Sequence, residues 1–270
     1  METIQTDVSD RALVTAIRAN MCDFFRHLGV SYPEGHFENG KFTRWRVPIH
    51  HPWFNGVLSS LPPGEQDETF VEETIRYFRA QQVGVFTWWM EPPLHCSDWE
   101  AALSHYGFVS STDTPGLAVE LRALNEPAQR VDGLQIRRVE DEDLVHSWGA
   151  AFTRGYGMPT EWEPAIHDIA VRLGSDFPVR NYLGYWNGEP VATSSLFLGA
   201  GVAGIYNVST LPKARGKGIG GALTLHPLQE AREMGYRIGT LQSSDMGYNV
   251  YRKLGFQHLC QIEYFRLALS

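Results

Sequence analysis

Cysteine and positive charge are both scarce in this sequence. Its 270 residues include three cysteines, Cys22, Cys96 and Cys260, an odd number without a CxxC spacing. Neither a disulfide framework nor a zinc site is therefore expected, and a reducing, cytoplasmic compartment is the simplest interpretation. The formal net charge of −8 is unlike the basic footprint of a nucleic-acid-binding protein. We therefore expect no bound metal and no nucleic-acid partner.

A targeting segment and a membrane span are not expected either. The N-terminal residues METIQTDVSD are polar and acidic, unlike a secretory or transit peptide. Residues 190–212 carry no charge and are long enough to cross a bilayer. However, glycines occupy the centre of this run, and Thr193, Ser194 and Ser195 precede them. We interpret the run as two buried strands joined by a glycine-rich turn, with no membrane partner.

The apolar residues, 43% of the chain, follow helical and extended patterns in turn. The first half predicts helices at residues 8–29, 68–82 and 98–106, and strands at 42–47, 53–59 and 83–90. The second half predicts helices at 141–154, 164–173, 220–234 and 246–254. Its predicted strands lie at 135–139, 181–186, 191–198, 203–210, 238–242 and 258–267. This mixture of helices and strands indicates the α/β class of fold, in its α+β form.

The two halves share an order of landmarks about 150 residues apart, an offset that indicates a duplicated unit. Asn39-Gly40 and Asn187-Gly188 are both hairpin dipeptides, Phe54-Asn55 is echoed by Tyr206-Asn207, and Leu61-Pro62 by Leu211-Pro212. Tyr106-Gly107-Phe108 is likewise echoed by Leu254-Gly255-Phe256. We therefore predict one domain at residues 1–124, a linker at 125–133 and a second domain at 134–270.

A glycine-rich turn follows the predicted strand at residues 203–210 and opens the next helix. It contains Gly216, Gly218, Gly220 and Gly221, and Lys213, Arg215 and Lys217 lie beside them. Because glycines leave room for backbone N–H groups to converge at a helix start, the turn is typical of a pyrophosphate cradle. A Walker A loop is excluded, since Lys217 is followed by glycine and not by Ser or Thr. A dinucleotide site stays open, because Gly216-x-Gly218-x-x-Gly221 formally matches GxGxxG and Asp245 follows downstream.

The turn and a second motif resemble a known family. Arg215-x-x-Gly218-x-Gly220 is similar to the (Gln/Arg)-x-x-Gly-x-(Gly/Ala) pattern of the GNAT acetyltransferases, and Tyr251-x-x-x-Gly255-Phe256 is similar to their Y-x-x-x-G-F segment. The resemblance implies two GNAT-like domains, each a mixed, mostly antiparallel twisted sheet flanked by helices. It implies acetyl-CoA as co-substrate, without a metal. The cofactor-binding residues that it implies are Val208, Ser209, Thr210, Arg215, Gly216, Lys217, Gly218, Ile219, Gly220 and Gly221.

Acyl transfer needs donors for the thioester oxygen, an acid for the leaving thiolate and a neutral amine. By the resemblance, Tyr251 is the catalytic acid and the backbone near Val208 polarises the carbonyl. A glutamate common in relatives is absent from residues 204–207, so water held by Tyr206 and Asn207, or an amine that arrives neutral, would replace it. Ser244 stands where relatives often have an asparagine that contacts the cofactor. The aromatic segment 152–162 lies where the family binds its acceptor.

The N-terminal half lacks these features. Residues 63–68 include Glu65, Asp67 and Glu68 where the other half has three cations, and Leu103 stands in place of Tyr251. Because negative charge repels a pyrophosphate, we expect a degenerate domain there and one working site per chain. The principal hypothesis is an N-acyltransferase that acts on an amine of a small molecule or peptide, with a homodimer left open. A non-enzymatic acyl-CoA-binding protein and a nicotinamide-dependent oxidoreductase are the alternatives.

Overall fold

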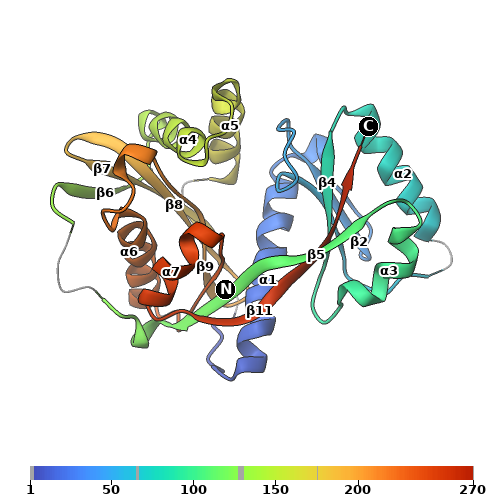
Figure 1. The fold of residues 1–270 in the computed structure, drawn as a ribbon, viewed down its shortest axis with the longest axis horizontal. Helices are drawn as coiled ribbons and strands as arrows, with labels where there is room; N and C mark the ends of the chain where they lie inside the picture. Colours follow the sequence, from blue (N-terminus) through green and yellow to red (C-terminus); the bar gives the residue numbers. More distant parts are fainter. Residues whose placement is uncertain (1–2, 65–66, 127–130, 175, 270) are drawn as a thin grey trace. The chain divides into compact units, whose positions relative to one another are not determined.

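The protein is described by a computed structural model, which covers residues 3–64, 67–126, 131–174 and 176–269 (Figure 1). The first half of the chain forms α1 (Asp10–Val30), β1 (Phe37–Glu38), β2 (Phe42–Arg46), β3 (Asn55–Ser59), α2 (Asp67–Ala80), β4 (Val85–Met90), α3 (Cys96–Ser104) and β5 (Val109–Glu120). The second half forms β6 (Leu134–Arg138), α4 (Glu142–Tyr156), α5 (Glu163–Leu173), β7 (Val179–Trp186), β8 (Glu189–Gly199), β9 (Val202–Thr210), α6 (Ile219–Glu233), β10 (Ile238–Gln242), α7 (Asp245–Lys253) and β11 (Gln257–Ala268).

The chain divides into two compact units. Unit 1 comprises Met1–Phe24 and Pro115–Cys260, and unit 2 comprises Phe25–Thr114 and Gln261–Ser270. These units do not follow the boundary predicted at residues 125–133, because α1, β5 and β11 each pass from one unit into the other. The first part of α1 and the end of β5 belong with the second half of the sequence, and the end of β11 belongs with the first.

Strand β5 is the longest strand that the sequence analysis did not predict. Its polar start and its Pro115-Gly116 dipeptide have the pattern of a turn or linker. The strand exists because residues 116–120 pair antiparallel with β10, a partner more than a hundred residues away in the sequence. Residues 264–268 of β11 pair in the same way with β4. The strand that follows α3 thus completes the sheet of unit 1, and the strand that follows α7 completes that of unit 2.

Unit 1 has the strand order β5-β10-β9-β8-β7-β6, with β9 and β10 parallel and the other neighbours antiparallel. Helices α4 and α5 lie on one face of this sheet, and α6 and α7 lie on the other (Figure 1). The core between the sheet and α6 contains the apolar side chains of Ile205, Leu223 and Leu241, together with Phe256, which lies between α7 and β11. Unit 1 is thus a twisted, mostly antiparallel sheet between two layers of helix.

Unit 2 has the strand order β1-β2-β3-β4-β11, with β3 and β4 parallel. An aromatic core that includes Phe42, Phe78, Phe86, Trp88 and Trp99 lies between this sheet and helices α2 and α3. The succession β1-β2-β3-α2-β4-α3-β5 repeats that of β7-β8-β9-α6-β10-α7-β11. The predicted repetition of landmarks therefore corresponds to a repeated order of elements.

The uncharged run at residues 190–212 is a β-hairpin. It contains β8 and β9, joined by a turn in which Ala200 and Gly201 have φ values of 52° and 69°. The two-strand interpretation is therefore confirmed. Among the residues that the structure describes, we find no helix with the length and apolar character needed to cross a membrane.

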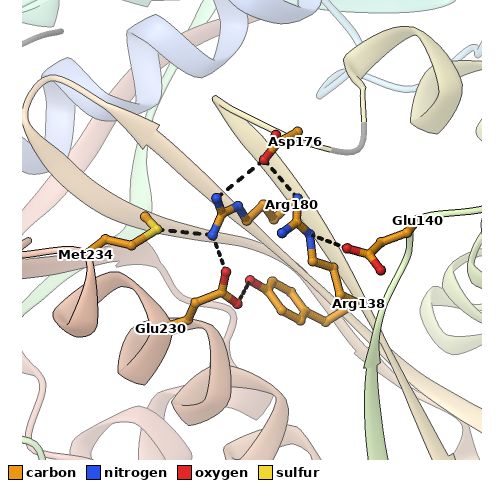
Figure 2. A network of polar contacts seen from close by, with 7 residues as sticks. Arg138, Glu140, Asp176, Arg180, Glu230 and Met234 are labelled. Atoms are coloured by element: carbon orange, nitrogen blue, oxygen red, sulfur yellow. Dashed lines mark hydrogen bonds and ion pairs between the residues drawn. The ribbon is translucent and has the colours of Figure 1, made fainter.

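A polar network fixes the second half of α6 to β7 (Figure 2). Arg180 of β7 donates to Glu230 of α6 and, at 3.3 Å, to Asp176, while its Nη1 lies 3.0 Å from the sulfur of Met234. Tyr182 donates a hydrogen bond to the same Glu230. Burial, and then the hydrogen bond to Glu230, raise the pKa of the Tyr182 phenol. Because its C-terminal half is held here, α6 presents its N-terminus at a defined place beside β9.

Candidate functional site

The glycine-rich turn leads directly into α6. Gly216 and Gly218 have φ values of 76° and 82°, a region that favours glycine, and Gly218 is the N-cap of the helix. The first α-helical hydrogen bond runs from the Ala222 N–H to the Gly218 carbonyl, at 3.0 Å. The N–H groups of residues 218–221 therefore precede the internal ladder of the helix. With no acidic residue in its first turn, this helix start fits an anionic phosphate group.

The three cations of the turn have different surroundings. Lys213 forms an exposed ion pair with Glu189, which contributes little to stability in water. The Lys217 ammonium lies 4.9 Å from the centroid of the Trp186 ring. Arg215 instead donates from Nε to the Thr210 carbonyl at 3.0 Å and from Nη2 to the Gly155 carbonyl at 2.8 Å. Its guanidinium group is thus engaged with the backbone.

Strand β9 contains a bulge just before the turn. Ser209 pairs with Thr193 and Tyr206 pairs with Ser195, so two residues of β9 lie opposite Ser194 alone. Asn207, the first of these two, has a φ of 56°. Thr193 donates to the Asn207 carbonyl at 2.8 Å, and the Asn207 amide donates to Ser195 at 3.0 Å. Buried hydroxyl groups therefore hold the bulge in place.

Beyond this bulge, β9 has an open edge. In the described part of the chain, pairing of β9 with the parallel strand β10 is confined to residues 203–205. The Leu211 N–H bonds to the Val191 carbonyl of β8 at 2.8 Å. The alternation of a strand then turns the N–H groups of Thr210 and Val208 toward the β10 side. These donors are suited to an amide or to a carbonyl oxygen that gains charge.

The side chain of Ser209 does not face that edge. It is 4% exposed, and its hydroxyl lies 2.8 Å from the Thr193 hydroxyl and 3.5 Å from the Ala151 carbonyl of α4. The Thr210 carbonyl already accepts from Arg215. The side chain of Ser209 is thus engaged inside unit 1 and its backbone pairs with Thr193 of β8, so its contact with the cofactor stays a prediction.

Tyr251 lies in α7, close to α6. The residue is 8% exposed and its ring is 6.0 Å from that of Phe256. Burial raises the pKa of its phenol to about 12, although a hydrogen bond with Thr224 of α6 opposes this. The phenol therefore keeps its proton at neutral pH, as a general acid must. Ser244, where relatives often carry asparagine, accepts a hydrogen bond from the Gly247 N–H at 3.3 Å and caps α7.

A second tyrosine, which belongs to the aromatic segment 152–162 of the sequence analysis, lies near Tyr251. Tyr156 is the last residue of α4, and its ring lies 4.8 Å from that of Phe152. Although 46% of the residue is exposed, burial and the nearby Tyr251 phenol raise the pKa of its hydroxyl. One phenol of the predicted acceptor segment 152–162 thus lies near the predicted acid.

The predicted water relay through Tyr206 and Asn207 has other partners. The Tyr206 hydroxyl donates to Asn20 Oδ1 at 2.7 Å, and its ring stacks on Phe24 at 4.1 Å. Asn20 in turn donates to the Gly199 carbonyl at 2.8 Å. Helix α1 therefore contributes to this site from the opposite end of the sequence. The predicted helix was correct, but only the structure assigns its first part to unit 1.

Unit 2 differs from this arrangement at each corresponding point. Strands β3 and β4 stay paired through Ser59 and Met90, so their edges do not part. At the start of α2, the Asp67 carboxylate accepts from the Gly64 N–H at 2.6 Å and forms an ion pair with Lys41. Leu103, the counterpart of Tyr251, is fully buried. A carboxylate thus stands where a phosphate would have to bind.

Comparison with known proteins agrees with the geometry of unit 1. Residues 142–256 match the model of the acetyltransferase (GNAT) family. The matched residues all lie in unit 1. This match supports an acyl-transfer enzyme. A comparison with curated proteins gives no match.

Solved structures share the fold over most of the chain. A GCN5-related N-acetyltransferase from Kribbella flavida is 21% identical with a TM-score of 0.60, covering 90% of this chain and 94% of its own. A tandem GNAT protein from the clavulanic acid biosynthesis pathway is 12% identical with a TM-score of 0.57, covering 98% and 97%. A GCN5-related N-acetyltransferase from Sphaerobacter thermophilus is 14% identical with a TM-score of 0.57, covering 84% and 76%. The predicted fold class, with mixed, mostly antiparallel sheets flanked by helices, is confirmed.

Proposed function

We propose that unit 1 transfers the acetyl group of acetyl-CoA to an amine of a small molecule or peptide. The observation that carries the proposal is the course of β9. The strand leaves β10 after Ile205, bulges at Asn207 and ends in a glycine turn at the start of α6. This course joins an edge of backbone donors to an anion site along one line, as an extended molecule with a phosphate end and a thioester end requires.

The N–H groups at the start of α6 would bind the pyrophosphate, with the charge of Lys217 beside them. The open edge of β9, near Val208 and Thr210, would bind the pantetheine amides and polarise the thioester carbonyl. When bound, acetyl-CoA supplies the activated acetyl group. The protein holds it beside the amine, and such positioning is itself a large part of the rate enhancement.

Tyr251 would give its proton to the departing sulfur. Its raised pKa, about 12, keeps that proton available, and a positioned acid contributes about 10²–10⁴-fold. Residues 204–207 include no carboxylate to accept the proton of the amine. We therefore propose that the acceptor binds as the neutral amine or loses its proton to water.

Two observations favour a second candidate, an acyl-CoA-binding protein without turnover. Residues 204–207 contain no acid, and Ser244 is used as a helix cap. Two measurements separate the candidates. Calorimetric titration with acetyl-CoA, CoA and NAD identifies the ligand, and thiol release with a panel of amines measures turnover. Tyr251→Phe is the control.

The proposed enzyme binds acetyl-CoA, releases CoA with at least one amine, and loses most of that rate in Tyr251→Phe. Binding of acetyl-CoA without release of CoA for any amine would support the acyl-CoA-binding protein instead. Binding of NAD in place of acetyl-CoA would refute both candidates and restore the dinucleotide hypothesis.

A further inference from the structure

We infer that the Arg215 side chain is a strap that fastens the end of α4 to the end of β9, and is not a phosphate ligand. The strap is defined by the two hydrogen bonds of Arg215, to the Thr210 carbonyl and to the Gly155 carbonyl. It makes Arg215 a positioning residue for the acceptor side of the site. This role in the reaction rests on the proposed function, whereas the strap itself rests on geometry alone.

The two hydrogen bonds use different nitrogens of one rigid group. Nε donates to Thr210 at 3.0 Å and Nη2 donates to Gly155 at 2.8 Å. A planar guanidinium offers these donors in a fixed geometry, so both carbonyls are held at a defined separation. A cation at the C-terminal end of a helix is also favoured by the helix dipole, and Gly155 lies in the last turn of α4.

The strap lies where α4 and β9 are already in contact. A Cβ atom built on Gly155 would lie 2.5 Å from Ser209 Oγ and 3.4 Å from the Thr210 nitrogen. The backbone of α4 therefore rests directly on β9, next to the open edge whose N–H groups face the proposed thioester. A helix end that rose from β9 would disturb that edge.

The same helix end carries the acceptor side of the site. Tyr156, which lies near Tyr251, follows Gly155 directly. Gly157 then ends the helix in the left-handed region, and the N–H groups of Gly157 and Met158 bond to the carbonyls of Arg154 and Thr153 at 3.2 and 2.9 Å. A strap at Gly155 thus fixes the direction in which Tyr156 and the segment after it leave α4.

A substitution can cut one bond of the strap and keep the other. The amide nitrogen of glutamine stands as far along its side chain as Nε stands in arginine, so Arg215→Gln retains a donor for Thr210 and loses the donor for Gly155. Arg215→Met removes both donors. Lys217→Met is the matched control, because it removes one cation from the same turn and leaves the strap intact.

Hydrogen exchange tests the strap without any ligand. We expect the Gly157 and Met158 amides to exchange about 10-fold faster in Arg215→Gln, since a bond from a charged donor is lost. Arg215→Met should be at least as fast, and Lys217→Met should match the wild type. An unchanged exchange rate in both Arg215 variants would overturn the strap. Arg215→Gln keeps the test valid if Arg215→Met fails to fold.

Salt dependence and steady-state kinetics test the role in the reaction. A phosphate ligand contributes charge, so its loss lowers both the affinity for CoA and the salt dependence of that affinity. We expect this of Lys217→Met. In Arg215→Gln the salt dependence should stay as in the wild type, while KM for the amine rises about 3-fold or more. A reduced salt dependence in Arg215→Gln would make Arg215 a phosphate ligand instead. Failure of the wild type to bind CoA would refute the proposed function and leave the exchange result standing.

Discussion

The contact of α4 with β9 leads to a quantitative prediction about Gly155. In Gly155→Ala, the new Cβ would lie 2.5 Å from Ser209 Oγ and 2.8 Å from Ser209 Cβ. Both distances are shorter than real Cβ contacts, and Ser209 is held by Thr193. The end of α4 must therefore move away from the strand. Overpacking of this kind costs about 1–3 kcal/mol.

A second glycine of the same helix provides the control. A Cβ atom on Gly149 would lie 3.4 Å from the His167 nitrogen, an ordinary contact. Both substitutions gain helix propensity, about 1 kcal/mol for glycine to alanine, so their difference isolates the clash. We expect Gly155→Ala to be about 1–3 kcal/mol less stable than Gly149→Ala. Because 1 kcal/mol shifts the melting temperature of a chain of this size by about 2–4 °C, the two should differ by at least about 2 °C.

Urea denaturation followed by tryptophan fluorescence gives the free energy of unfolding of both variants. The double variant Gly155→Ala with Ser209→Ala should recover only part of the loss, since the Cβ of residue 209 remains. Thiol release should fall in Gly155→Ala and stay near the wild-type rate in Gly149→Ala. Equal stability of the two single variants would refute the close approach of α4 to β9.

Three further predictions concern the acid and the network at β7. Tyr251→Phe should lower the rate of thiol release about 10²–10⁴-fold at saturating acetyl-CoA, with its affinity for CoA unchanged by calorimetry. The phenol of Tyr251 has a pKa of about 12 in the folded protein and of about 10 in the unfolded chain. Its contribution to the stability of the folded protein is therefore complete below pH 10 and is lost between pH 10 and 12. Over this interval the urea midpoint should fall less in Tyr251→Phe than in the wild type. Arg180→Met should cost about 1–3 kcal/mol in urea, because Glu230 loses a charged partner. In the Arg180→Met variant, the further substitution Glu230→Gln should lower the free energy of unfolding by less than it does in the wild type. Strictly additive losses would contradict the coupling of the two residues.

Local chemistry made the turn and the hairpin predictable. Gly216 and Gly218 have the positive φ values that a glycine-rich turn favours, and the β8–β9 hairpin follows from an uncharged run with glycines at its centre. The proposed acid Tyr251 and the proposed phosphate turn belong to motifs with fixed spacing. In each case a few neighbouring residues carry the signal.

Features made by distant partners were not predictable from the sequence. Strand β5 depends on its pairing with β10, so its Pro115-Gly116 dipeptide misled the local interpretation. The bulge at Asn207 depends on Thr193 and Ser195 of the neighbouring strand. The strap depends on where α4 ends. These side chains have ordinary polar identities, and only the fold gives them their roles.

Each half of the sequence supplies a strand to the sheet of the other unit, which limits how the protein can evolve. Unit 1 needs residues 116–120 and the first part of α1, which the sequence of the N-terminal half encodes. A gene that kept only residues 134–270 would leave the outer edge of β10 without this partner, and exposed strand edges promote aggregation. Deletion of the N-terminal half would therefore remove structure from unit 1, whether or not unit 2 binds a ligand. Two halves that complete each other's sheets in this way can differ in activity, but the loss of either would expose a strand edge of the other.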